Sequence, residues 1–248
     1  MTKVTKLDRF LKRHVTKTLG THINLDMGTY MLIDEDEDIN DFYKVYIEHV
    51  FQKNKEAYLI EKQLNEGPIL LDIDFKYNTD VISKQHNRSH IKKLVKIILD
   101  GINEIMYIEQ NIPIDFYFFE KKNVNRLEKI TKDGIHLMIN LKMNIANKLT
   151  LRKYILNKIP EIWNDLPLLN TWNDVFDEYM FKGLTSWQLY GSRKTKNEPY
   201  ELKYIFSCFY TEDNEWKINQ EEFNYEWIIH NFKELTARNC TLVDFLSK

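Results

Sequence analysis

One short segment decides how this chain is interpreted: PILLDIDF, residues 68–75. Its apolar, β-branched and aromatic residues predict a buried strand. Because successive side chains of a strand point to opposite faces, Asp72 and Asp74 share one face, and the apolar residues between and beside them share the other. The segment therefore places two carboxylates side by side, about 7 Å apart along the strand.

Two carboxylates at this spacing need partners, because like charges repel and each group is costly to bury alone. A divalent cation removes both penalties. Mg²⁺ and Mn²⁺ prefer hard oxygen ligands and are commonly held by one or two carboxylates together with substrate phosphates. The alternative is that Asp72 and Asp74 lie at a strand end and cap loops or pair with lysines. Alone, the pair only suggests a metal site.

Two further segments contain side chains that suit a phosphate ligand. In KDGIHLMI (residues 132–139) a turn at Asp133–Gly134 leads into a strand, and His136 lies at its start. A histidine there can donate to a phosphate or bind a metal, and a glycine lets a ligand approach the backbone. GSRK (residues 191–194) follows a strand-like segment and offers a hydroxyl and two cations. Taken singly, a structural histidine and a solvated basic turn are the simpler explanations.

Composition excludes several classes of protein. The 248 residues carry 35 Lys and Arg against 37 Asp and Glu, a formal charge of −2, so no global positive field drives nucleic-acid binding. Neither a Walker A motif nor G-x-G-x-x-G occurs, which excludes a P-loop ATPase or dinucleotide-binding site. Cys208 and Cys240 are too few for a disulfide framework or a zinc ribbon, so we expect a reducing, intracellular setting. No signal peptide or run of about 18 apolar residues occurs, so we expect no membrane partner.

Hydrophobic periodicity predicts a chain in which helices and strands alternate. We expect helices over residues 3–18, 39–55, 151–163 and 222–236 and a further one capped by Ser89, and strands over residues 68–75, 114–119, 135–141, 187–191 and 202–209. The acidic run at residues 34–38 is expected to be a solvated loop rather than a metal site. With at least five strands, the fold class is α/β or α+β.

In this order the motifs resemble those of the archaeo-eukaryotic primase superfamily, specifically the primase domain of primase-helicases from nucleocytoplasmic large DNA viruses of the poxvirus and mimivirus type. That family's signature is a D-x-D on a strand, a G-x-H at a strand start, and a lone Asp shortly before a G-S-x-K corner. The chain contains Asp72 and Asp74, Gly134 and His136, Asp177, and Gly191-Ser192-Arg193-Lys194 at these places. Thr21-His22 and Leu59-Ile60-Glu61 add weaker likenesses.

The resemblance, which covers about residues 18–210, implies an α+β primase-polymerase core. In that core an RRM-like catalytic sheet with helices behind it joins a second α/β module, and the active site lies in the cleft between them. We expect a single primase domain over residues 1–248, with its catalytic core at about 18–210 and a C-terminal helical segment at about 211–248. Without a Walker A motif, no helicase domain is expected in this chain, although such family members usually continue into a superfamily 3 helicase.

The resemblance also implies the chemistry: DNA-templated nucleotidyl transfer that makes primers on single-stranded DNA from NTPs or dNTPs, in viral DNA replication in the host cytoplasm. Two Mg²⁺ or Mn²⁺ ions would be held by three carboxylates, and no zinc is expected. The implied metal ligands and catalytic residues are Asp72, Asp74 and Asp177, and the implied nucleotide-binding residues are Gly134, His136, Ser192, Arg193 and Lys194. Asp177 is preferred over Asp115, Asp174 and Glu178 because of its distance from the G-S-x-K corner.

Other clusters and other functions stay open at this point. Lys121, Lys122 and Arg126 follow a predicted strand and suit a loop over a DNA template, although a solvated surface is the default. His86 and His90 precede a helix and have no obvious third ligand for a metal. The competing functions are a metal-dependent nuclease that uses the D-x-D carboxylates and a degenerate single-strand-binding module. The intact D-x-D argues against degeneracy.

Overall fold

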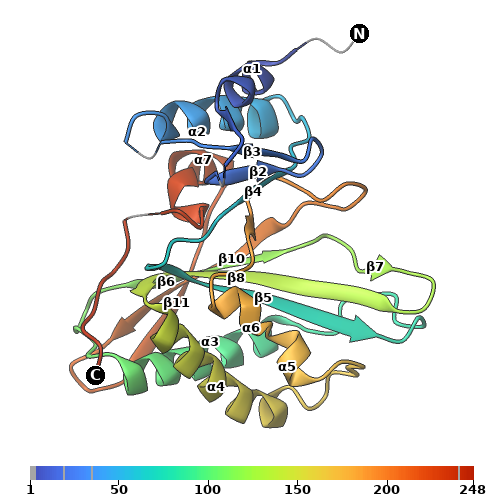
Figure 1. The fold of residues 1–248 in the computed structure, drawn as a ribbon. Coiled ribbons are helices and arrows are strands. Elements are labelled where there is room, and N and C mark those ends of the chain that lie inside the picture. Colours follow the sequence, from blue (N-terminus) through green and yellow to red (C-terminus); the bar gives the residue numbers. More distant parts are fainter. Residues whose placement is uncertain (1–3, 19, 35, 240) are drawn as a thin grey trace.

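The computed structural model of the protein describes residues 4–18, 20–34, 36–239 and 241–248. Two antiparallel sheets form the middle of the molecule, with helices above the smaller sheet and below the larger one in the view of Figure 1. The α+β fold class is therefore confirmed. Glu35 of the acidic run and Cys240 lie outside the described residues.

The larger sheet contains the D-x-D segment, residues 68–75. Its strands have the order β11–β10–β6–β8–β5, and the short β7 pairs with β8. The strands are β5 (Gly67–Tyr77), β6 (Ile114–Glu120), β7 (Asn125–Arg126), β8 (Thr131–Met143), β10 (Glu201–Tyr210) and β11 (Trp216–Glu221). Along β5, Leu71, Ile73 and Phe75 are fully buried, whereas Asp72 and Asp74 on the other face are not. The predicted alternation is confirmed.

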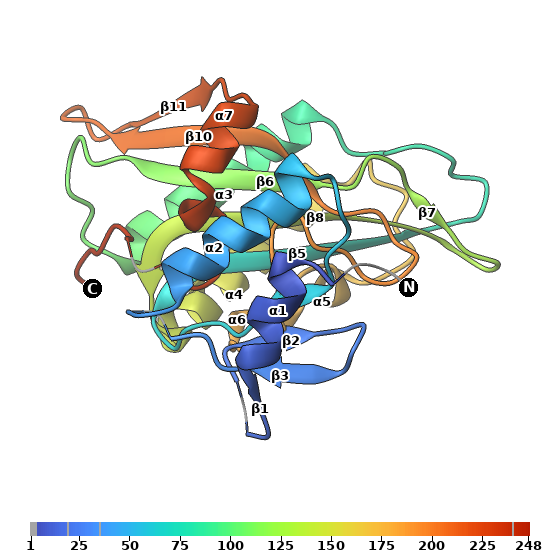
Figure 2. The same ribbon diagram turned by 90° about the horizontal axis from the view of Figure 1, so that it is seen from above.

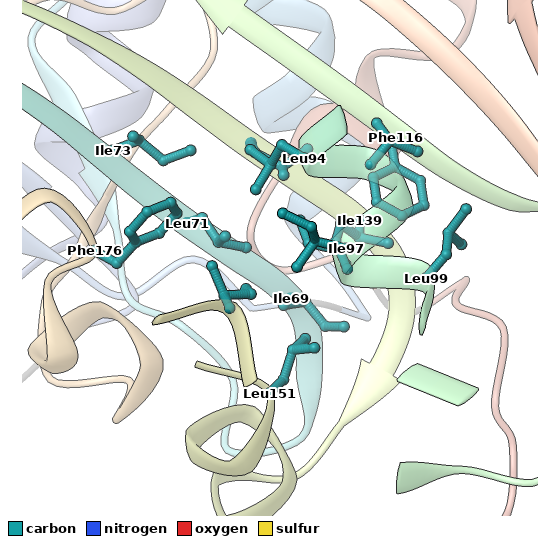
Figure 3. Close-up of a cluster of buried hydrophobic side chains, with 14 of the residues drawn as sticks. Ile69, Leu71, Ile73, Leu94, Ile97, Leu99, Phe116, Ile139, Leu151 and Phe176 are labelled. Carbon is teal, nitrogen blue, oxygen red and sulfur yellow. The ribbon is translucent and has the colours of Figure 1, made fainter. Parts of the chain in front are cut away.

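Two long helices, α3 (Arg88–Ile105) and α4 (Ile145–Ile162), pack against the lower face of this sheet (Figure 1). Figure 3 shows the apolar side chains between them, including Leu71 and Ile73 of β5, Leu94 of α3 and Leu151 of α4. Each such side chain contributes roughly 1.5–3 kcal/mol when fully buried, so this layer fixes β5 and β8 firmly in place. The cap of α3 is Asn87, whose side chain accepts from the N–H groups of Ser89 and His90, and not Ser89 as predicted.

The smaller sheet has the order β1–β3–β2–β4–β9 and consists of very short strands. They are β1 (Val15–Thr16), β2 (His22–Asn24), β3 (Thr29–Met31), β4 (Leu59–Glu61) and β9 (Trp187–Gln188). Above it lie α1 (Lys6–Arg13) and α2 (Ile39–Ile47), which continues into the π-helical turn η1 (Glu48–Gln52). A second core joins this half to the upper face of the larger sheet, with Phe42 and Trp187 on one side and Tyr117 and Met138 on the other.

The remaining helices are short: α5 (Trp172–Val175), α6 (Glu178–Phe181), α7 (Tyr225–His230) and the 3₁₀ turn η2 (Phe232–Leu235). Figure 2, from above, shows α2 and α7 lying across the larger sheet. The expected helix over 222–236 is therefore two short ones. The expected helical segment at 211–248 was wrong in part, because it begins with β11, which extends the larger sheet. No helix among the described residues has the length and apolarity needed to cross a bilayer.

Candidate active site

The pairing of β5 with β8 brings the D-x-D and G-x-H motifs together. The antiparallel register sets Asp72 opposite His136 and Asp74 opposite Gly134. Directly opposed residues of paired strands point to the same face, so all four positions lie on the face turned away from α3 and α4. His136 Nε2 is 3.4 Å from Asp72 Oδ1. Two motifs that are distant in the sequence thus form one cluster of side chains.

A cavity of about 310 Å³ lies over this cluster. Its walls come from both sheets and from two loops: Asp72, Asp74, Gly134 and His136 from the strand pair, Gln188 from β9, Lys121, Asn123, Asn125 and Leu127 from the β6–β8 connection, and Lys194, Asn197 and Tyr200 from the β9–β10 connection. The volume is at the lower end of the range for small-molecule sites. The cluster therefore lies between the two sheets, where the resemblance places an active site.

The two carboxyl groups of the D-x-D have different environments. Burial opposes ionisation of Asp72, but the charge of His136, followed by those of Lys194 and Lys121, outweighs it and holds the pKa of this carboxyl below its ordinary value. Burial raises the pKa of Asp74, and the negative charge of Asp72 adds to the effect. The Asp74 side chain is in part open to solvent, which limits this rise. The charged form of Asp72 is thus stabilised by neighbouring cations, whereas the charged form of Asp74 is destabilised by the negative charge of Asp72.

The chemistry of Asp72 and Asp74 fits a divalent cation. Asp72 Oδ1 is buried and has no hydrogen-bond partner within the described part of the chain, since 3.4 Å to the His136 ring is long for a hydrogen bond. A buried carboxylate oxygen without a partner, next to a second carboxylate, is an environment that Mg²⁺ or Mn²⁺ relieves. Over the residues that the structure describes, no group of three or more His, Cys, Asp or Glu is arranged to hold a metal. Of the three carboxylates expected to bind metal, Asp72 and Asp74 line the cavity.

The expected third ligand, Asp177, lies at the free edge of β5. Phe176 forms an isolated antiparallel bridge with Ile73, and in that register Asp177 is the neighbour of Asp72. Its carboxylate does not line the cavity but caps α6, where Oδ1 accepts from the N–H of Tyr179 at 3.0 Å. The structure thus brings Asp177 beside the D-x-D strand, with its side chain in a capping role.

The competing acids have structural roles elsewhere. Asp115, on β6, accepts from the side-chain amide of Asn140 at 3.0 Å and does not line the cavity. Asp174 forms a capping box with Thr171 at the start of α5. Glu178 pairs with Lys182 on the exposed side of α6. Of the four acids considered for the third position, Asp177 is the one that borders Asp72.

Three lysines line the cavity: Lys121, Lys194 and, on β8, Lys132. Lys121, which the sequence placed in a template-binding loop, lies in the cavity wall together with Lys194. Burial lowers the pKa of Lys121, and the neighbouring charge of Lys194 lowers it further. Both ammonium groups act on the Asp72 carboxylate. The site therefore sets lysine ammonium groups near the Asp72 and Asp74 carboxylates, an arrangement that suits a phosphate-bearing ligand bound with divalent cations.

The other residues of the G-S-x-K corner build the turn that carries Lys194. Ser192 is fully buried, and its hydroxyl accepts from the N–H of Leu59 at 3.0 Å and shares a hydrogen bond with the Tyr46 hydroxyl. Arg193 donates through Nη1 to the carboxylate of Glu56 at 3.0 Å. Neither residue lines the cavity. Both side chains of the turn thus have protein partners, and their contact with a nucleotide stays a prediction.

Gly191 begins the same turn, and only glycine suits its place. Its φ of +86° lies in the left-handed region, and a Cβ there would come within 2.9 Å of the side chains of Val50 and Phe51. The backbone conformation of the turn and the close approach of Val50 and Phe51 thus explain why this motif has a glycine at position 191. Of the four residues of the predicted phosphate-binding corner, Lys194 is the one that lines the cavity.

The remaining sequence candidates lie around the cavity or away from it. Lys122 and Arg126 are exposed on the β6–β8 connection, whose residues 123, 125 and 127 line the cavity. His86 contacts Glu120 at 3.1 Å, whereas His90 contacts Asp165 at 3.0 Å. Because the two histidines face different acids, they form no common metal site.

The sequence argument missed Gln188 and Tyr200. Gln188 donates from Nε2 to the backbone oxygen of Ser192 at 2.6 Å and so holds the turn before Lys194. Tyr200, directly before β10, packs its ring against His136. No pattern in the sequence marks either residue. Position after the G-S-x-K corner is the one signal that could have pointed to Tyr200.

Comparison with known proteins agrees with this geometry. A family model described as the C962R protein N-terminal AEP domain matches residues 21–206. The chain belongs to the archaeo-eukaryotic primase (AEP) family. This family comprises primase-type nucleotidyltransferases, and all four motifs of the AEP domain described above lie within the matched residues. The resemblance inferred from the motifs is confirmed.

The AEP domain is also similar to a protein of Acanthamoeba polyphaga mimivirus named "Putative helicase L207/L206". The two are 27% identical over an alignment of 202 residues, and the match covers 79% of this chain and 20% of the mimivirus protein. The chain thus spans about a fifth of the length of the curated relative that it matches.

Proposed function

We propose that this AEP domain is a DNA-templated nucleotidyltransferase that makes primers on single-stranded DNA by joining NTPs or dNTPs. The observation that carries the proposal is the pairing of Asp72 and Asp74 with Gly134 and His136 beneath one cavity whose wall also contains Lys194. Carboxylates for divalent cations next to cations for phosphates are the parts that nucleotidyl transfer uses. Membership of the AEP family supports the same chemistry.

Asp72 and Asp74 would hold Mg²⁺ or Mn²⁺, with Asp177 at the edge of β5 as the next carboxylate. When bound, two such ions would lower the pKa of the attacking 3′-hydroxyl and neutralise charge on the phosphates. The chain itself supplies a fixed position for the carboxylates, because both lie on a strand that is packed against α3 and α4. Asp177 can take part through the carboxylate oxygen that does not accept from Tyr179.

The triphosphate would be gripped by His136, Lys121 and Lys194. The lysines act as point charges on the β- and γ-phosphates, and the imidazole donates a hydrogen bond from a ring nitrogen. Gly134 lines the cavity and, having no side chain, leaves space there for a ligand. A Cβ at this position would lie 3.5 Å from Asp74 Oδ1 and would occupy space next to the carboxylate.

The template would pass over the connection between β6 and β8. Lys122 and Arg126 are exposed there, and the same connection contributes Asn123, Asn125 and Leu127 to the cavity. Cations at the mouth of the cavity neutralise phosphates of the template locally, which a chain of net charge −2 can do despite its overall balance.

The similarity to the mimivirus protein supports a proposal about the full-length protein. The mimivirus protein is about five times longer than the matched segment and is named a helicase. We propose that the full-length protein joins the AEP domain to a superfamily 3 helicase, and that it makes primers during viral DNA replication in the host cytoplasm.

A primer-synthesis assay tests the proposal. The protein is incubated with single-stranded DNA, Mn²⁺ or Mg²⁺ and labelled nucleotides, and the products are separated on a denaturing gel. Extension by the parent and its loss in Asp72→Asn are expected. Asp115→Asn is the matched control, because Asp115 is also an acid on a strand of the larger sheet but does not line the cavity. Cleavage of the DNA would favour the nuclease, and binding without either reaction would favour a degenerate module.

A further inference from the structure

The ring of Tyr200 lies flat against the imidazole of His136. The two ring centres are 3.6 Å apart and the planes differ by 17°. Trp187 also contacts the imidazole, at 4.4 Å and 35°. The Nζ of Lys121 lies 4.8 Å from the centre of the Tyr200 ring. Tyr200 therefore joins two residues of the proposed phosphate grip, one from β8 and one from the β6–β8 connection.

Packing is what fixes the orientation of the imidazole. The torsion that turns a histidine ring has a broad energy profile, and functional histidines are usually oriented by a hydrogen bond to the second ring nitrogen. Within the described residues no hydrogen bond to His136 Nδ1 is present, and the one polar contact of the ring is Nε2 with Asp72 Oδ1 at 3.4 Å. That polar contact is long for a hydrogen bond, whereas the Tyr200 ring covers the face of the imidazole at 3.6 Å between ring centres, so the stack sets the plane of the ring.

The G-x-H spacing suits this stack. Gly134 and His136 lie two residues apart on β8 and so point to the same face, and the Tyr200 side chain reaches across both. A Cβ on Gly134 would lie 3.1 Å from the Tyr200 hydroxyl and 3.0 Å from the backbone oxygen of Ile73. The glycine therefore leaves room for the phenol, while the histidine stacks on its ring.

We propose that Tyr200 is a positioning residue of the nucleotide site, which holds the His136 imidazole in the plane where Nε2 faces Asp72 and the bound triphosphate. It acts through His136 rather than on the ligand. Stacked aromatic pairs contribute about 0.5–1.5 kcal/mol beyond their buried area, which corresponds to a roughly three- to tenfold change in affinity. The identity of the ligand rests on the proposed function, whereas the orientation of His136 does not.

A double-mutant cycle tests whether Tyr200 acts through His136. The affinity for a non-hydrolysable nucleoside triphosphate is measured by calorimetry for the parent, Tyr200→Leu, His136→Ala and the double variant. We expect Tyr200→Leu to weaken binding roughly three- to tenfold in the parent and to add nothing in the His136→Ala background. Tyr200→Phe, which keeps the ring, should recover most of the loss. Additive effects would overturn the proposal, as would a loss in Tyr200→Phe as large as in Tyr200→Leu.

Tyr204→Leu is the matched control. Tyr204 is also a half-buried tyrosine near the start of β10, but its ring packs against Phe206 at 6.0 Å rather than against the site. It should bind the triphosphate as the parent does, and a loss equal to that of Tyr200→Leu would mean that any change near this strand disturbs the site.

A measurement on the parent needs neither a stable variant nor a bound nucleotide. In ¹H–¹³C spectra, the imidazole protons of His136 should be shifted strongly upfield by the ring currents of Tyr200 and Trp187, and should move toward ordinary positions in Tyr200→Leu. Unshifted signals in the parent would overturn the positioning role. If the parent shows the shift but does not bind the triphosphate, the proposed function fails and the positioning of His136 stands.

Discussion

Replacing Lys194 by methionine should weaken nucleotide binding about ten- to a hundredfold, whereas Arg193→Met should have little effect. The two cations are adjacent in the sequence, but only Lys194 lines the cavity. A hydrogen bond to a charged group contributes about 1.5–3 kcal/mol, which is roughly ten- to a hundredfold in affinity. Lys194 is exposed without a ligand, so screening by salt should bring the loss toward the lower end.

Arg193 has a different partner, and this difference makes it the control. Its guanidinium lies 3.0 Å from the Glu56 carboxylate, and both side chains are partly exposed. A surface pair of this kind contributes about 0–1 kcal/mol to stability, and its loss does not reach the cavity. Methionine keeps most of the length and the apolar stem at both positions, so the comparison isolates the charge.

Calorimetric titration with a non-hydrolysable triphosphate in Mg²⁺, at low and at moderate salt, measures both variants. The parent's affinity should fall with salt more steeply than that of Lys194→Met, because one charge contact is missing in the variant. Equal affinity of Lys194→Met and the parent would refute the assignment of Lys194 to the phosphate grip. If Arg193→Met lost as much triphosphate affinity as Lys194→Met, both cations of the G-S-x-K corner would belong to the binding site.

Three further predictions concern the carboxylates, the template and the buried charges. Asp74→Asn should abolish primer synthesis on a gel while the melting temperature of the metal-free protein stays equal or rises, because the variant loses the repulsion from Asp72; a lower melting temperature would contradict this. Charge reversal at Lys122 and Arg126 should weaken single-stranded DNA binding and flatten its salt dependence in fluorescence anisotropy, with nucleotide affinity unchanged; equal salt slopes in variant and parent would argue against a template contact. Burial opposes ionisation of Glu120, but the imidazole of His86 and the ammonium group of Lys84 outweigh it and lower the pKa of this carboxyl. The ionised Glu120 therefore stabilises the fold above the ordinary pKa of a glutamate. This contribution is lost as the pH falls through the lowered pKa. Glu120→Gln should therefore be less stable in urea at neutral pH, with the difference shrinking in acid; a constant difference would show that the charge is not the cause.

Strand periodicity predicted the face of the D-x-D but not its partner. The alternation in PILLDIDF was sufficient to place Asp72 and Asp74 opposite the core, because burial on one face leaves its mark on every second residue. Which strand pairs with it, and in which register, depends on contacts distant in the sequence. The pairing of Asp72 with His136 therefore came from the structure, not from the pattern.

Hydrophobic periodicity did not predict most strands of the smaller sheet. Its strands are two or three residues long, and an alternation of period two cannot be recognised over so few positions. Helix limits were misjudged for a related reason. The apolar pattern of residues 3–18 predicts one helix, but α1 ends at Arg13. The apolar residues that follow belong to a strand of this sheet, because Val15 and Thr16 form β1. Tertiary pairing, rather than local preference, decides the conformation there.

Acids embedded in strands also look alike in a sequence. Asp115 lies between apolar residues as Asp72 does, yet it is opposite Ser207 on β10 and is bound by Asn140. A polar partner on the neighbouring strand satisfies it, whereas Asp72 Oδ1 has no such partner within the described residues. What distinguishes a site carboxylate from a structural one is therefore the neighbouring strand, which the local pattern does not contain.

The carboxylates and the cations of the site are supported by different parts of the fold. Asp72 and Asp74 lie on a strand whose opposite face is packed against two helices, so their spacing is set by the strand itself. Lys121 and Lys194 come from two connections that leave different sheets and meet over that strand. Strand residues leave a periodic mark in the sequence, but the side-chain directions in a turn do not. This is why the sequence pattern placed Asp72 and Asp74 on one face, whereas it did not indicate that the Lys121 and Lys194 side chains line one cavity.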